Sequence, residues 1–168
     1  MKKTSILLLA ICCLLTLASC QKKGAPQFLG DYSFKTSGSV TARSTYTLNH
    51  KEFDITLKNE IGQLQISSLD KKNDSVVVVM NYMDGDVIVT HAYCHDNEIV
   101  LKKFKRNALN LSFDGSFEIK CEVDVLTKGT IYDDNTLIFN MIYDGAAVLG
   151  PITYDLYGND IRMVATRN

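Results

Sequence analysis

The stretch FEIKCEVDV at residues 117–125 alternates apolar and charged side chains over its whole length. Successive side chains of a β-strand point to opposite faces of a sheet, so this period of two predicts a strand with one face in a core and one in water. Residues 136–143 also carry apolar side chains at alternate positions, which are Leu137, Phe139, Met141 and Tyr143. We predict that the two stretches pair as a hairpin.

Turn signals divide the chain on both sides of this hairpin. The dipeptide Asp-Gly tolerates the positive φ angles of a tight hairpin turn, and it occurs at residues 84–85, 114–115 and 144–145. Polar clusters at residues 95–98 and 132–135 predict two further turns, and Gly158-Asn159 predicts a turn or a bulge. One strand and one turn in about 15 residues is typical of an up-and-down meander.

The rest of the chain favours strands as well. Apolar alternation begins at Gly30 and returns in residues 45–57, 64–66 and 152–165, and no window has the i, i+3, i+4, i+7 pattern of an amphipathic helix. Residues 76–80 are apolar on both faces, so this strand is either covered on both sides or part of an interface. We therefore predict an all-β fold, an antiparallel meander of about 8–10 strands that closes into a barrel, with a two-sheet β-sandwich as the alternative.

The N-terminus has the layout of a secretory signal. Lys2 and Lys3 precede an uncharged apolar block at residues 6–17, and small residues follow it. This block has 12 residues, whereas a spanning helix needs roughly 20, so a signal peptide fits better than an uncleaved membrane anchor. Leu17-Ala18-Ser19-Cys20 resembles the lipobox of bacterial lipoproteins, which implies removal of residues 1–19 and lipidation of Cys20.

The predicted organisation follows from this cleavage site. Residues 20–27 form a lipidated tether, and residues 28–168 form one β-barrel domain, since their length suits a single core. The lipid at Cys20 makes the membrane a partner of the chain. Because Lys22 and Lys23 stand where surface-exported lipoproteins tend to carry acidic residues, we expect an address in the Gram-negative cell envelope, on the outer membrane and facing the periplasm.

Charge and cysteine positions allow two further predictions. The chain has 18 basic and 19 acidic residues and no basic stripe, so we expect no nucleic-acid partner. Export would permit a disulfide between Cys94 and Cys121. The two cysteines fall on strands that are not neighbours in a meander, and a disulfide needs Cα atoms within about 7 Å, so we predict two free thiols.

The two ends of the barrel domain carry a family resemblance. Residues 28–32, Phe-Leu-Gly-Asp-Tyr, followed by a meander whose closing strand contains Arg162, resemble the calycin-type, lipocalin-like domains of bacterial lipoproteins. In lipocalins a Gly-x-Trp motif opens the barrel and an arginine of the closing strand packs across the ring. The resemblance implies a closed antiparallel barrel with room for an apolar cavity, and it places Arg162 against Tyr32.

A carrier function would depend on the inward faces of the strands. If the barrel holds a small apolar or amphipathic ligand, such as a fatty acid, we expect its cavity to be lined by Phe117, Ile119, Val123, Phe139, Met141, Tyr154 and Leu156. If these side chains instead meet at the barrel axis, the interior is a filled core. The protein would then be a structural or inhibitory lipoprotein that acts on an unidentified protein partner through its loops or an edge strand.

The remaining reactive residues do not predict an enzyme. No Gly-x-Ser-x-Gly motif is present, and His50, His91 and His95 lack the spacing of a zinc site, so we expect no catalytic residue, no metal and no cofactor. One basic cluster consists of Lys102, Lys103, Lys105 and Arg106. We interpret it as a solvated edge strand protected by charge, and the alternative is a surface for anionic headgroups or an acidic partner.

Overall fold

The computed structural model describes residues 24–45, 51–57, 60–69, 74–113 and 117–168. The strands are β1 (Gly30–Ser37), β2 (Ser39–Ser44), β3 (Glu52–Thr56), β4 (Glu60–Ser68), β5 (Ser75–Tyr82), β6 (Val87–His95), β7 (Glu98–Phe113), β8 (Phe117–Asp133), β9 (Thr136–Leu149) and β10 (Ile152–Arg167). A short 3₁₀ turn, η1 (Ala25–Gln27), precedes them. In these described segments no helix is long and apolar enough to cross a membrane. The all-β prediction is confirmed.

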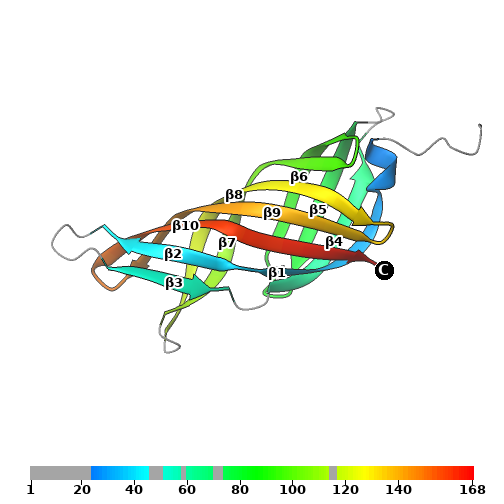
Figure 1. Ribbon diagram of the computed structural model, residues 1–168. Helices are drawn as coiled ribbons and strands as arrows, with labels where there is room; N and C mark the ends of the chain where they lie inside the picture. Colours follow the sequence, from blue (N-terminus) through cyan, green and yellow to red (C-terminus); the bar gives the residue numbers. More distant parts are fainter. Residues whose placement is uncertain (1–23, 46–50, 58–59, 70–73, 114–116) are drawn as a thin grey trace, which may run out of the picture.

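The strands form a closed antiparallel barrel (Figure 1). Eight of them follow one another in the order β1-β4-β5-β6-β7-β8-β9-β10, and β10 pairs with β1 to complete the circle. β2 and β3 are additional strands that continue the sheet from β10. The predicted barrel is therefore confirmed, and the two-sheet sandwich is wrong.

The two additional strands divide the molecule into two halves. The C-terminal part of β10, residues 162–167, pairs with β1, whereas residues 154–157 of the same strand pair with β2. A bulge between Gly158 and Ile161 separates the two parts, as predicted for Gly158-Asn159. We call the eight-stranded ring the closed half. The open half consists of β2, β3 and the parts of β7–β10 that extend beyond the ring (Figure 1).

The open half is not closed by hydrogen bonds among the described residues. β3 is the last strand of the sheet on one side, and it lies next to β7 without pairing with it. Gly38 marks the border between the halves with a φ of 137°, and a Cβ atom there would lie 2.5 Å from the carbonyl oxygen of Asp160. The chain therefore leaves β1 for β2 at a position that only glycine accommodates.

Two of the predicted Asp-Gly turns lie in the described residues, and only one of the two is a turn in the structure. Asp84-Gly85 connects β5 with β6 as expected. Asp144-Gly145 lies inside β9, so the prediction of a turn there is wrong. A Cβ atom at Gly145 would lie 2.5 Å from the carbonyl oxygen of Glu122 on β8, so the glycine permits close packing of two strands. Residues 114–115, between β7 and β8, lie outside the described residues.

The first and last strands of the ring are adjacent, as predicted, but a different arginine meets Tyr32. Arg162 lies opposite Ser37 and is exposed. Arg167 lies opposite Tyr32, with its guanidinium 5.3 Å from the ring centroid, and its Nη2 donates to the Tyr32 hydroxyl at 2.8 Å. The prediction for Arg162 is wrong because Ile161, Met163 and Ala165 are the inward residues of β10, so residue 162 points outward.

We expect Arg167→Ala to lower the free energy of unfolding by about 0.5–2 kcal/mol, because it removes a cation–π contact and the hydrogen bond to Tyr32. Urea unfolding followed by circular dichroism measures this difference. Arg162→Ala is the matched control on the same strand and should leave the midpoint unchanged. Equal effects of the two substitutions would contradict the assignment of Arg167 as the stabilising partner of Tyr32.

The two cysteines of the barrel are free, which confirms their prediction. Cys94 lies on β6 and Cys121 on β8, and β7 separates the two strands. Burial raises the thiol pKa of each to about 11, assisted by the charge of Asp74 at Cys94 and of Glu60 at Cys121. Both thiols are therefore protonated and unreactive at neutral pH.

Candidate functional site

Arg106 is a fully buried arginine in the barrel wall, with no exposed surface. The pairing of β7 with β8 shifts between Leu101 and Phe104, and again between Arg106 and Leu109. Each shift adds one residue to β7. The inward residues are therefore odd-numbered up to Leu101, even-numbered at 104 and 106, and odd-numbered again from Leu109. As a result Phe104 and Arg106 point inward, while Lys105 points to solvent.

This geometry refines the interpretation of the basic cluster. β7 pairs with β8 along the cluster, but its pairing with β6 ends at Leu101, so residues 102–106 have a paired strand on one side only. Lys103 and Lys105 form surface ion pairs with Asp124 and Glu122. Only Arg106 of the cluster turns into the protein, and its three neighbours remain on the outside.

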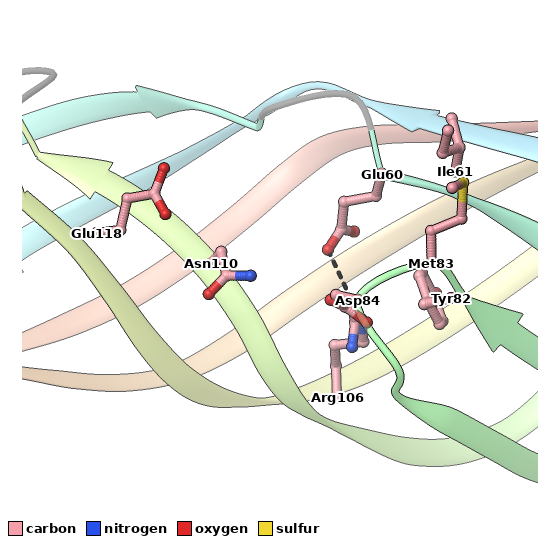
Figure 2. Close-up of a pocket in the computed structure, with 8 residues that line it drawn as sticks. All are labelled: Glu60, Ile61, Tyr82, Met83, Asp84, Arg106, Asn110 and Glu118. Atoms are coloured by element: carbon pink, nitrogen blue, oxygen red, sulfur yellow. Dashed lines mark hydrogen bonds and ion pairs between the residues drawn. The ribbon is translucent and has the colours of Figure 1, made fainter.

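Three carboxylates surround the buried guanidinium. Its Nη2 donates to Glu60 Oε1 at 3.0 Å and to Asp84, and its Nη1 donates to Asp86. Glu60 is the first residue of β4, while Asp84 and Asp86 belong to the turn between β5 and β6. Asp86 also accepts the backbone N–H of Asn107 at 3.1 Å. The cluster thus joins three separate segments, which are β4, the β5–β6 turn and β7. Figure 2 shows how Glu60, Asp84 and Arg106 from these segments lie together.

Two tyrosines complete the cluster. The guanidinium lies 3.7 Å from the centroid of the Tyr82 ring, in cation–π contact. The Tyr143 hydroxyl donates to Glu60 Oε2 at 3.4 Å. The Tyr82 hydroxyl and Arg106 Nε are buried, and neither has a hydrogen-bond partner within the described part of the chain. A buried hydroxyl without a partner is costly, so Tyr82 has an unused capacity to bind a polar group.

The charges of the cluster do not balance. Desolvation alone would lower the pKa of Arg106, but Glu60, Asp84 and Asp86 outweigh it and raise the pKa, so the guanidinium stays charged. Burial raises the pKa of Glu60 against the opposing effect of Arg106. Burial also acts to raise the pKa of Asp84, but the hydrogen bonds from Arg106 and from the backbone N–H of Asp86, together with the charges of Arg106 and Lys120, outweigh it, and the pKa is lowered. Three acidic groups therefore share one cation.

The cluster forms the floor of a half-enclosed pocket of about 190 Å³. Figure 2 shows its lining, with Asn110 and Glu118 on the side away from the cluster. Met83, which is 76% exposed, and Ile61, which is 42% exposed, supply an apolar rim. Glu118 is the third acidic residue of the lining, after Glu60 and Asp84. The pocket therefore combines an acidic interior with a small apolar edge.

The residues predicted to line an apolar cavity are packed into the core. Val123, Phe139 and Met141 are fully buried, Leu156 is 1% exposed and Tyr154 is 6% exposed. Ile119 is partly buried against the same core, and the side chain of Phe117 lies outside the described part. None of the six described side chains lines the pocket at Arg106 or the two larger pockets at the surface. Their role as a cavity lining stays a prediction.

Sequence reasoning did not identify the cluster. Asp84 belongs to the turn predicted at residues 84–85, but the turn signal does not indicate that Asp84 and Asp86 bind Arg106. The one usable signal was the interrupted alternation at Asn107-Ala108, which places a bulge next to Arg106. Among the described residues no group of histidine, cysteine and acidic side chains could hold a metal ion.

Comparison with known proteins adds a weak structural likeness. No protein-family model matches the chain, and no curated protein matches its sequence. A solved structure described as EF1p2_mFAP2b bound to DFHBI superposes with a TM-score of 0.41 and 10% sequence identity, over 88% of this chain and 98% of that one.

Proposed function

We propose that the protein is a lipid-anchored binding protein of the bacterial cell envelope, and that it holds a small amphipathic ligand in the pocket at Arg106. The observation that carries the binding proposal is Tyr82, which lines the pocket and whose hydroxyl is buried and has no partner among the described residues. A ligand that bonds to this hydroxyl would remove the cost of leaving it unsatisfied.

The charges of the pocket select the polar end of the ligand. Glu60, Asp84 and Glu118 line the pocket, and Arg106 is the one basic residue among its described lining residues. A cationic or hydrogen-bond-donating group, such as a primary amine, would lie close to these carboxylates and gain from them. A carboxylate-headed ligand such as a fatty acid would be repelled. The apolar end of the ligand would contact Ile61 and Met83 at the rim.

The apolar cavity expected from the sequence is the weaker place for a ligand. Phe139 and Met141 are fully buried in the core of the ring. A filled core instead favours the second candidate function, a structural or inhibitory lipoprotein that acts on a protein partner through its surface. In that case Arg106 would serve only to hold β4, the β5–β6 turn and β7 together.

A matched pair of probes tests the binding proposal. We expect 2-phenylethylamine to bind, as measured by calorimetry, and 3-phenylpropanoate, which has a similar shape and opposite charge, not to bind. Tyr82→Phe should weaken amine binding about fivefold, because it removes one hydrogen bond, and should leave the protein at least as stable. Tyr132→Phe, at an exposed tyrosine outside the pocket, is the control. Equal binding of the two probes would contradict the proposal.

The anchor is tested separately. We expect mass spectrometry of the membrane fraction to find a mature chain that begins at a lipid-modified Cys20, since the lipobox places the cleavage there. Cys20→Ser should release or mislocalise the protein. An intact Met1 terminus in the membrane fraction would contradict the anchor and leave the pocket proposal unaffected.

A further inference from the structure

The outer surface of β5 and β6 is apolar and uncharged. Val79 lies opposite Val89, and Tyr93 of β6 lies opposite Val100 of β7. Val89 is 65% exposed and Tyr93 is 71% exposed. We call this surface the apolar face, and it consists of Val77, Val79, Val87, Val89, Tyr93 and Val100.

The remaining outward residues of β5 and β6 are Ser75, Asn81, His91 and His95, so the two strands add no aspartate, glutamate, lysine or arginine to this face. The outward residues of β8, by contrast, begin Glu118, Lys120, Glu122 and Asp124. The apolar face is thus a local property of one side of the barrel, and contiguous exposed apolar surface of this kind marks a binding surface.

The apolar face is also grooved. β6 pairs with β7 only over residues 92–95. Next to this paired part, towards the start of β6, the side chain of Thr90 links the two strands by donating to the carbonyl oxygen of Lys102 at 3.0 Å. A groove of about 380 Å³ lies on the outside of the sheet near this point, and its lining includes Leu69, Tyr93 and Val100. Lys102 stands at its edge and is exposed.

The N-terminal end of the described chain lies beside this face. η1 contacts β6, and the side-chain amide of Gln27 donates to the carbonyl oxygen of Asp96, directly after β6 ends. Figure 1 shows η1 at this end of the barrel. Cys20 precedes Gly24 by four residues, which can span at most about 14 Å. A lipid on Cys20 would therefore hold the end of β6 close to the membrane.

We propose that the apolar face docks onto the bilayer that holds the lipid of Cys20, so that the barrel lies on its side. This inference rests on the anchor of the proposed function. Valine side chains would enter the interfacial layer, Tyr93 would lie at the headgroup level, where tyrosine is enriched, and Lys102 would meet the phosphates. The short tether keeps the apolar face near the bilayer surface, so even a small favourable free energy from its apolar contacts suffices for docking.

The absence of tryptophan from the chain makes a direct test possible. Tyr93→Trp and Val89→Trp each place one reporter on the apolar face. Val164→Trp is the matched control, because β10 lies across the ring from β6 and Val164 is an outward valine that is 36% exposed. The full chain is purified with its lipid and reconstituted in phosphatidylethanolamine–phosphatidylglycerol vesicles whose acyl chains are brominated, and quenching of fluorescence is measured.

We expect bromine to quench the two reporters of the apolar face about threefold more strongly than the control. Equal quenching of all three, in protein whose mass shows lipid on Cys20, would overturn docking and leave the anchor intact. Absence of lipid from Cys20 would overturn both. A blue-shifted emission without bromine quenching would show that protein, such as a second copy of the chain, covers the face, and it would also overturn docking.

Discussion

Replacement of Arg106 by leucine is expected to lower the free energy of unfolding by about 3–5 kcal/mol, because it leaves three partly buried carboxylates without their cation. Arg106 has no exposed surface, and it donates to Glu60 of β4 and to Asp84 and Asp86 of the β5–β6 turn. The leucine would fill part of the space, but it could neither neutralise the acidic groups nor satisfy their oxygens. Urea unfolding of both proteins at neutral pH measures the difference.

Two variants sharpen this prediction. Lys105→Leu removes a positive charge from the neighbouring position, where the side chain is exposed and pairs with Glu122 on the surface, and it should leave the stability nearly unchanged. Arg106→Lys keeps the charge but loses the planar fork, so its cost should lie between the two. A loss below about 1 kcal/mol for Arg106→Leu would show that the cluster does not support the fold.

The cost of Arg106→Leu should also depend on pH. In the wild type Arg106 acts to lower the pKa of both Glu60 and Asp84. Without it the folded-state pKa of each carboxyl rises, so the folded variant binds protons more readily than the folded wild type. The variant therefore loses less stability than the wild type on acidification, and the difference between them should narrow from about pH 7 to about pH 4. A constant difference would contradict a charge-based role.

Phe139→Ala is expected to lower the free energy of unfolding by about 3–5 kcal/mol, as for a large side chain in a filled core. Phe139 is fully buried. Its ring lies against Gly129 of β8, where a Cβ atom would be 2.4 Å from the Phe139 ring. Removal of the ring would leave a void that the rigid barrel wall could close only in part.

A second substitution tests the packing of this ring. Gly129→Ala should cost about 1–3 kcal/mol in the wild type, because the new methyl group meets the ring. In the Phe139→Ala background the same change should cost much less, so the two effects should not add. If Phe139→Ala instead cost below about 1 kcal/mol and altered uptake of an apolar probe, the ring would be a cavity wall and the carrier prediction would gain support.

Local alternation was sufficient to predict much of the fold. Residues 117–125 and 136–143 lie in the paired strands β8 and β9, and the polar clusters at 95–98 and 132–135 lie at turns. The separation of Cys94 and Cys121 followed from strand order alone. These features depend on the period of two and on turn chemistry, which neighbouring residues determine.

The candidate site could not be predicted in the same way. Arg106 turns inward only because two bulges shift β7 against β8, and its partner Glu60 is 46 residues away in the sequence. Likewise, Arg167 meets Tyr32 because the register of β10 against β1 places the two residues opposite each other when the ring closes. Local patterns therefore predict most of the strands, most of their turns and the order of β4 to β10. They do not predict which charged residues meet inside the barrel, because bulges and the closing register depend on contacts between distant strands that no local pattern encodes.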